Sequence, residues 1–374
     1  MTKVNIKDIY YINPSVDVYK IGEDVLEFYF INTKRRVAIS VTPLVFDLIS
    51  TFNKKYSLEE VCERNNIILD EDIISFILYL KEERLIFSLN EKSKNKFLIS
   101  EIDKERYDRQ LLYFDSISEL SSFQVQKNIQ EQVVLIFGVG AIGSGIAIQL
   151  AMAGVRNFIF VDKDYLTQDS ISRHFYFDEK DIGKDKVDAL SSYLYQIDSS
   201  VNCKAVKMIL DYDTDISDLI QESKFVINTM DEPYIGITSL KIGRECFRYD
   251  IPLYVTGGFD AHLMSTGELI IPGKTPCVDC YTHYFTGALK NWKPIYNSEI
   301  VTKKQTDIDN FEVGGIASMS LFSISYAVLK VLDFFIKKDN SMEYGRGELL
   351  FNEELEIKYL EINRNPKCLI CGNK

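Results

Sequence analysis

Four cysteines in two identical spacings are the clearest chemical feature of this chain. Cys277 and Cys280 form one Cys-x-x-Cys pair, and Cys368 and Cys371 form a second pair near the end of the sequence. Two such pairs are typical ligands of one tetrahedral Zn²⁺ ion, and four protein ligands leave no open position for water. We therefore predict a structural zinc site that fastens the C-terminal tail to the segment after residues 272–274. A redox dithiol is the alternative.

A glycine-rich turn is the second chemical feature. Gly138, Gly140 and Gly143 follow the apolar run 133–137 and precede a stretch with helical spacing. In such a unit the first glycine permits the tight turn, the second lets the backbone approach phosphate oxygens, and the third lets the helix pack on the strand. Backbone N–H groups at the helix start then face the anion. The pattern predicts a nucleotide site, and a plain glycine-rich turn is the alternative.

An acidic residue lies where the ribose of a nucleotide needs it. Asp162 ends the next apolar run, about twenty residues after the last glycine, as in dinucleotide-binding units. A carboxylate at that strand end accepts hydrogen bonds from ribose hydroxyls, and Asp164 is assigned to the same site. A helix cap is the alternative for Asp162. These residues fit NAD and ATP equally well.

The charged residues that follow favour ATP. Arg173, Lys184 and Lys186 come shortly after Asp162. A triphosphate needs such cations when its α-phosphorus is attacked, whereas a nicotinamide site has no particular need for them. Asp231 follows the apolar run that ends at 230, so we expect it at the carboxyl edge of a sheet, where it can hold Mg²⁺. Solvated surface charges and a loop aspartate are the alternatives.

The elements that would position these residues alternate between strand and helix. A helix is expected at 141–153, and strands are expected at 133–137, 158–161, 225–227 and 253–255. Continuous apolar runs are typical of strands buried on both faces. The alternation predicts an α/β fold with a doubly wound, Rossmann-like, mostly parallel sheet. The uncharged stretch 313–329 contains glycine and serine, so we predict a buried helix and not a membrane span.

Residues 1–87 are predicted to form a small winged-helix-like α+β domain. Two strands, expected at 25–30 and 36–41, would form a hairpin. Three helices would follow, the first beginning at Thr42-Pro43, the second after Ser57 and the third covering 73–80. The polar segment 88–104 is predicted to be a linker, which leaves 105–374 as the second domain.

Composition limits the partners and the compartment. The net charge of −12 disfavours nucleic acid and anionic membranes as partners. The N-terminus shows no apolar signal segment, and seven cysteines with two metal-type pairs indicate a reducing compartment, so a cytoplasmic location is expected. Cys62, Cys203 and Cys246 are expected to be core residues.

The ordered motifs of the second domain resemble those of the ubiquitin-activating-type (ThiF/MoeB/MccB) adenylyltransferase family, with MccB-like peptide-modifying enzymes the most similar. The resemblance covers about residues 105–374 and rests on segments 106–110, 138–143, 161–164 and 183–186, on Arg173 and Asp231, and on both cysteine pairs.

This resemblance implies roles for individual residues. Asp162 would hold the ribose, Arg173 and Lys186 the phosphates, and Asp231 would serve Mg²⁺ and catalysis. The family is typically homodimeric, which implies that Arg109 reaches into the partner subunit's site.

Departures from the family pattern refine these expectations. Ser170 stands where the family often has asparagine, which puts one nucleotide or phosphate contact in question. Residues 281–367 contain no cysteine, so acyl transfer to an enzyme thiol is not expected. Residues 1–87 resemble the peptide-recognition domain of MccB-like enzymes, and a peptide is expected to add as a strand beside Val25–Phe30. A dimerisation or stabilising domain is the alternative.

The sequence thus predicts ATP-dependent adenylation of a carboxylate on a ribosomally made precursor peptide, as the first step of its modification, with ATP, Mg²⁺ and Zn²⁺ as cofactors. Three alternatives stay open: an activator of a ubiquitin-like sulfur-carrier protein, a non-catalytic leader-peptide-binding scaffold and an NAD-dependent oxidoreductase. The peptide, its activated carboxylate and the final product are not set by the sequence.

Overall fold

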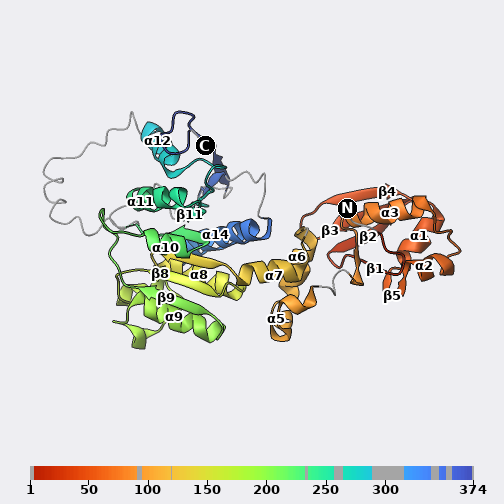
Figure 1. The fold of residues 1–374 in the computed structure, drawn as a ribbon, viewed down its shortest axis with the longest axis horizontal. Helices are drawn as coiled ribbons and strands as arrows, with labels where there is room; N and C mark the ends of the chain where they lie inside the picture. The colour runs from red at the N-terminus through yellow and green to blue at the C-terminus, as the bar shows by residue number, and fades with distance from the viewer. Residues whose placement is uncertain are drawn as a thin grey trace. The chain divides into compact units, whose positions relative to one another are not determined.

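A computed structural model describes residues 4–90, 95–118, 120–231, 235–256, 264–288, 316–337, 345–350 and 356–372 of the chain. By internal packing the chain divides into two compact units, Met1–Asn128 and Ile129–Lys374 (Figure 1). The sequence-based boundary between 87 and 105 stays a prediction.

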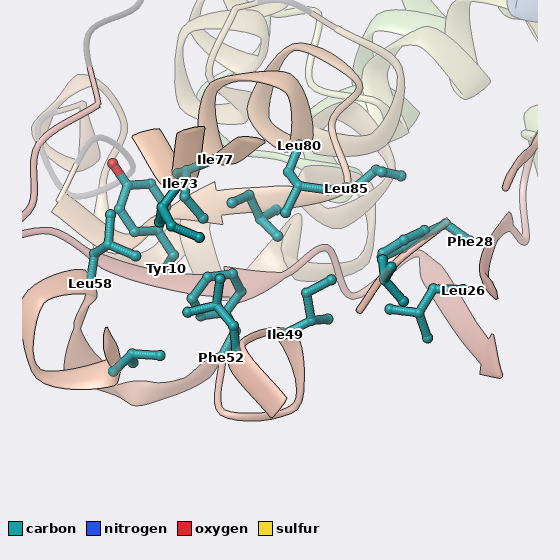
Figure 2. Close-up of a cluster of buried hydrophobic side chains, with 14 of the residues drawn as sticks. Tyr10, Leu26, Phe28, Ile49, Phe52, Leu58, Ile73, Ile77, Leu80 and Leu85 are labelled. Atoms are coloured by element: carbon teal, nitrogen blue, oxygen red, sulfur yellow. The ribbon is translucent and has the colours of Figure 1, made fainter. Parts of the chain in front are cut away.

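The first part of this unit, up to Ser88, contains two three-stranded antiparallel sheets and three helices around one core. One sheet has the order β2-β3-β4, with β2 at Val16–Ile21, β3 at Val25–Phe30 and β4 at Arg36–Ser40. The other has the order β5-β1-β6, with β1 at Ile9–Ile12, β5 at Asn53–Ser57 and β6 at Ile86–Ser88. The helices are α1 at Pro43–Ser50, α2 at Leu58–Arg64 and α3 at Glu71–Glu82. Figure 2 shows the apolar side chains that meet between these elements, among them Phe28, Leu58 and Ile77.

The helix starts of this unit follow the predicted signals. Thr42 caps α1 by accepting the N–H of Val45 at 3.4 Å, with proline in the first turn. Ser57 and Glu60 form a reciprocal capping box on α2, in which each side chain accepts the other residue's backbone N–H. These caps confirm two of the three predicted helix starts in detail.

The predicted site of strand addition in this unit is wrong. β3 pairs with β2 on one side and with β4 on the other, so both edges of Val25–Phe30 are occupied. β2 was not among the predicted strands, because its apolar residues are interspersed with Asp17, Tyr19 and Lys20 and the segment resembles a polar loop. Among the described strands, the open edges of this sheet are those of β2 and β4.

The rest of the first unit consists of short helices, the last of which extends into the second unit. They are η1 at Lys96–Leu98, α5 at Glu101–Arg106, α6 at Asp108–Ile117 and α7 at Ser122–Gln130. The described end of the predicted linker is therefore partly helical.

The second unit is built on a six-stranded sheet of order β12-β11-β10-β7-β8-β9. Its strands are β7 at Val133–Phe137, β8 at Asn157–Val161, β9 at Asn202–Val206, β10 at Phe225–Asn228, β11 at Leu253–Val255 and β12 at Glu268–Ile270. Its helices and its hairpin are α8 at Ala141–Met152, η2 at Gln168–Ser172, η3 at Glu179–Asp181, α9 at Lys186–Ile197, α10 at Ser217–Glu222, α11 at Ile235–Arg248, α12 at Val278–Ala288, α14 at Ala317–Lys337, β13 at Arg346–Leu349 and β14 at Ile357–Leu360.

This sheet has the predicted doubly wound form. The strands from β11 through β9 pair in parallel, and β12 is an antiparallel edge strand. The chain runs from β7 outward through β8 and β9, and then returns to the opposite side of β7 as β10. The carboxyl ends of β7 and β10 therefore form a topological switch point, which is where ligands bind in open α/β sheets.

The long apolar helix α14 belongs to the core of this unit. By length and composition it is apolar enough to cross a membrane. However, α14 packs on α8 so closely that a Cβ atom on Gly145 would lie 2.4 Å from Ile324. Phe335 also meets Phe225 of β10 with ring centroids 5.3 Å apart. The predicted buried helix is confirmed over its described residues, while 313–315 lie outside them.

Candidate functional site

The glycine turn lies at the switch point, between β7 and α8. Gly138 has φ +82°, and a Cβ atom there would lie 3.0 Å from Thr229 Oγ1. A Cβ atom on Gly143 would lie 2.0 Å from the carbonyl oxygen of Gly138. Gly140 differs, because a Cβ atom built on it meets no described atom within 4 Å. The first and third glycines are thus required by the fold, whereas the second faces open space suited to a phosphate.

The end of β10 is fastened to this turn by Thr229, which the sequence analysis did not single out. Its hydroxyl donates to the carbonyl oxygen of Gly138 at 2.7 Å. The buried amide of Asn228 fixes the same strand end by accepting the N–H of Met230 at 3.0 Å. Asp231 follows and is exposed beside the turn, at the predicted carboxyl edge. Thr229 could have been predicted as a site residue, because it is a polar residue directly after a buried strand.

Asp162 connects the end of β8 to the glycine turn. Its Oδ2 atom accepts the N–H of Val139 at 2.8 Å, and its Oδ1 atom accepts the N–H of Asp164 at 2.9 Å. The side chain is 7% exposed. Since each carboxylate oxygen has two lone pairs, both oxygens can also accept from a ribose hydroxyl. Asp162 is therefore oriented by the turn itself, and it is not a simple helix cap.

The predicted phosphate-binding cations lie on the loop after β8 and at the start of α9. Lys186 Nζ lies 3.0 Å from Asp164 Oδ2, and the lysine side chain is 15% exposed. Arg173 Nη2 lies 3.0 Å from Asp169 Oδ2, and its side chain is 43% exposed. The pair of Arg173 with Asp169 is exposed to solvent, and such ion pairs contribute little stability. Arg173 can therefore exchange its carboxylate for a phosphate at small cost, whereas Lys186 is more enclosed.

Ser170, the departure from the family pattern, has a local role. Its hydroxyl accepts the N–H of Thr167 at 3.3 Å and is 2.9 Å from the Thr167 hydroxyl. The residue is 2% exposed. The side chain therefore closes the η2 turn that leads to Arg173.

Arg109 belongs to the other unit. It lies on α6, its side chain is 90% exposed, and Nε is 3.6 Å from Asp108 Oδ2. The predicted role of Arg109 in the site of a second copy stays a prediction.

The four cysteines converge on one point, as predicted. Their sulfur atoms all lie within 4.8 Å of one another. Cys277 Sγ is 3.9 Å from Cys280 Sγ, and two cross-pair distances are 3.5 Å. A tetrahedral zinc ion with Zn–S bonds of about 2.3 Å requires sulfurs about 3.8 Å apart. The donor set and spacing fit Zn²⁺.

Polar contacts around the cysteine cluster join the tail to the loop before α12, and α12 to α11. Arg364 donates to the carbonyl oxygens of Gly273 at 2.8 Å and Cys371 at 2.7 Å. Arg244 of α11 makes a bidentate pair with Asp279, between the first two cysteines. These contacts agree with a closed, structural site.

The other cysteines are of a different kind. Cys62 and Cys246 are buried, as predicted, while Cys203 is only half-buried. Burial raises the pKa of the Cys203 thiol to about 11, so little thiolate exists at neutral pH.

Comparison with known proteins identifies a family that matches this chain and several relatives of similar sequence. A model of the ThiF family matches residues 107–370. The chain is 27% identical over 279 residues to the adenylyltransferase and sulfurtransferase MOCS3 of Caenorhabditis briggsae, covering 74% of this chain and 62% of that protein. It is 24% identical over 281 residues to the molybdopterin-synthase adenylyltransferase of Escherichia coli, covering 73% and 98%.

Some solved structures resemble nearly the whole chain in fold. Escherichia coli MccB with a succinimide has a TM-score of 0.74 at 20% identity and covers 98% of this chain and 100% of that one. The same protein with ATP has a TM-score of 0.73 at 21% identity and the same coverage. By contrast, the chain spans only 62% and 64% of the lengths of MOCS3 and of the vegetative HesA protein of Trichormus variabilis.

Proposed function

Because the chain belongs to the ThiF family of ATP-dependent adenylyltransferases, we propose that it adenylates a carboxylate of a ribosomally made precursor peptide. Pyrophosphate is the second product, and the activated acyl group then enters a further modification step. The alternative of an NAD-dependent oxidoreductase finds no support in the family match.

The observation that carries this proposal is that three elements follow the carboxyl ends of two neighbouring parallel strands. The open face of Gly140, the oriented carboxylate of Asp162 and the cations Arg173 and Lys186 lie on consecutive segments around the carboxyl ends of β7 and β8. Such an arrangement suits a nucleoside triphosphate, because amide donors and cations face an anion while a carboxylate faces the ribose.

The reaction needs positioning and charge stabilisation more than proton transfer. A carboxylate is already ionised at neutral pH, so it attacks the α-phosphorus directly, and the bond to pyrophosphate breaks with its electron pair on the leaving group. Arg173 and Lys186 would stabilise charge on the phosphates, and the N–H groups at the start of α8 would face them.

Two metals would complete the enzyme. Mg²⁺ bound by Asp231 would supply charge neutralisation between phosphate oxygens. Zn²⁺ bound by the four cysteines would hold the fold and take no part in the reaction.

Recognition of the peptide is assigned to the first unit. The β4 edge is the better of the two open edges, because Val37 and Ile39 pack against the core but remain half-buried there. A strand added along β4 would complete their burial while pairing its main chain. Among the structural relatives, Escherichia coli MccB has been solved with MccA, which supports a peptide partner.

The second candidate function is activation of a sulfur-carrier protein. It is favoured by the printed activities of the sequence relatives, which include a ThiS adenylyltransferase of Bacillus subtilis at 24% identity over 261 residues. It leaves the first unit without a role. We also propose a homodimer, with Arg109 completing the partner's site, and a cytoplasmic location, where thiolate ligands stay reduced.

ATP–pyrophosphate exchange tests the proposal. Exchange that depends on a cognate precursor peptide, and not on a protein ending in Gly-Gly, is expected. Asp231→Ala should abolish it, while Asp279→Ala, at an exposed ion pair near the zinc cluster, should not. Undiminished exchange in Asp231→Ala would contradict the assigned role.

A further inference from the structure

The loop that carries Arg173 contains a buried polar side chain without an assigned role. The base of this loop is closed by a bridge between Tyr165 and Asp185. His174 follows Arg173 directly and is only 9% exposed. Its Nδ1 atom lies 2.9 Å from the carbonyl oxygen of Ser170.

The Ser170 carbonyl is the point that fixes the turn. It accepts the backbone N–H groups of Arg173 and His174, each at 3.0 Å, in addition to the imidazole. A carbonyl oxygen only accepts, so Nδ1 must carry the proton. In the neutral ring Nε2 is then an acceptor, and it is buried without a hydrogen-bond partner among the described residues.

The surroundings of the ring keep it neutral and in place. The pKa of His174 is lowered from 6.5 to about 4, mainly by burial and also by the positive charges of Lys186 and Arg173. The hydrogen bond to Ser170 acts in the opposite direction but is a smaller effect than burial. The ring meets Tyr176 and Phe177 edge-on, with centroids 5.7 and 5.8 Å away. Tyr176 in turn lies 6.4 Å from Tyr193 of α9. The imidazole is thus held between its carbonyl partner and an aromatic cluster.

We propose that His174 is a positioning residue, which holds the backbone turn beneath Arg173 so that the guanidinium is presented to the triphosphate before ATP binds. This inference rests on the proposed function, since it requires Arg173 to contact the nucleotide. His174 would contribute to ATP affinity by preorganisation. Because the turn is already ordered before ATP binds, binding does not have to include the entropic cost of ordering it.

Three variants separate the hydrogen bond from the packing. His174→Leu removes the donor, and His174→Gln keeps a neutral donor of similar reach. Tyr176→Phe is the matched control, because the Tyr176 hydroxyl is buried without a hydrogen-bond partner in the described part of the chain. We expect His174→Leu to raise the Kd for ATP, measured by calorimetry, about fivefold, the factor typical of one net hydrogen bond. His174→Gln and Tyr176→Phe should stay within about twofold.

A double-mutant cycle with Arg173→Met decides between positioning and general stability. If His174 acts through Arg173, His174→Leu causes no further loss of ATP affinity in the Arg173→Met background. Additive losses in the double variant would overturn the inference. An unchanged Kd in Arg173→Met alone would instead overturn the phosphate role of Arg173, and the inference with it. Melting temperatures identify variants that do not fold, and His174→Phe then replaces His174→Leu in the same cycle.

Discussion

The carboxylate of Asp162 accepts a 2.8 Å hydrogen bond from the backbone N–H of Val139, which ties the end of β8 to the turn after β7. The proposed ribose acceptor and the proposed phosphate cradle are therefore one connected unit. A change in either one displaces the other, because they share this bond.

Replacement of Asp162 by asparagine should weaken both the fold and ATP binding. The amide can accept through one atom only, so one of the two backbone N–H groups now held by Asp162 loses its partner. We expect a loss of about 1–3 kcal/mol in the free energy of unfolding and at least a tenfold increase in the Kd for ATP.

Asp198→Asn is the control for Asp162→Asn. Asp198 is also buried, and its carboxylate lies 3.6 Å from Arg156 Nε, so asparagine would remove one charge of a largely buried pair. It lies after α9 and away from the strand ends that form the site. Denaturation and calorimetry should show destabilisation without loss of ATP affinity in this control. Equal Kd values for Asp162→Asn and the wild type would contradict the ribose assignment.

Lys186→Met should reduce pyrophosphate exchange about 100-fold, the size expected when one charge-stabilising group is lost from a transition state. Lys207→Met is matched to it, since Lys207 pairs with Asp185 and Asp188 at the start of the same helix. Exchange rates at saturating peptide provide the measurement. Similar losses in both variants would show a general charge effect instead of a phosphate contact.

The pH dependence of stability should report the burial of His174. The folded pKa of about 4 lies below the unfolded value of 6.5, so the unfolded state binds the extra proton between these values. Stability is therefore complete above pH 6.5 and falls toward pH 4, by up to about 3 kcal/mol. Urea unfolding at pH 7 and pH 5 should show a smaller decrease in His174→Gln than in the wild type. An identical decrease in both would mean that His174 is not buried in its neutral form.

Zinc should be present at one ion per chain and should be needed for stability. Cys371→Ser removes a fully buried ligand, and loss of a structural metal is among the few changes that cost more than about 4 kcal/mol. A decrease of roughly 10 °C in melting temperature is expected for a unit of this size. Atomic absorption measures the zinc content and calorimetry measures the melting temperature, with Cys203→Ser as the control variant. A zinc-free chain with wild-type stability would refute the site.

The β4 edge can be tested with a double variant, Val37→Thr and Ile39→Thr. Threonine keeps the strand propensity but weakens apolar burial beneath an added strand, so the Kd for the precursor peptide should increase several-fold. Ile21→Thr, at the end of the β2 edge, should leave the Kd unchanged. If Ile21→Thr has the larger effect, the peptide pairs with β2.

Much of the second unit follows from its sequence. The run Val133–Phe137 is the strand β7 as predicted, because a strand buried on both faces must be apolar throughout. The glycine turn and the four-cysteine cluster could also be predicted, because the spacing of the residues in the sequence is enough to indicate them.

Other features depend on contacts that spacing does not determine. β5 at Asn53–Ser57 is polar along most of its length, so it resembles a loop until β1 is present to pair with it. The buried ion pair of Arg346 and Glu268, at 3.1 Å, joins residues on strands far apart in the sequence. The bond from Thr229 to Gly138 likewise exists only because β10 returns beside β7.

The structure of the chain with a non-hydrolysable ATP analogue is the most direct test of the nucleotide site. We expect the triphosphate to lie across Gly140, with Arg173 and Lys186 moved from Asp169 and Asp164 onto phosphate oxygens. A nucleotide bound elsewhere, with both cations still on their carboxylates, would contradict this expectation.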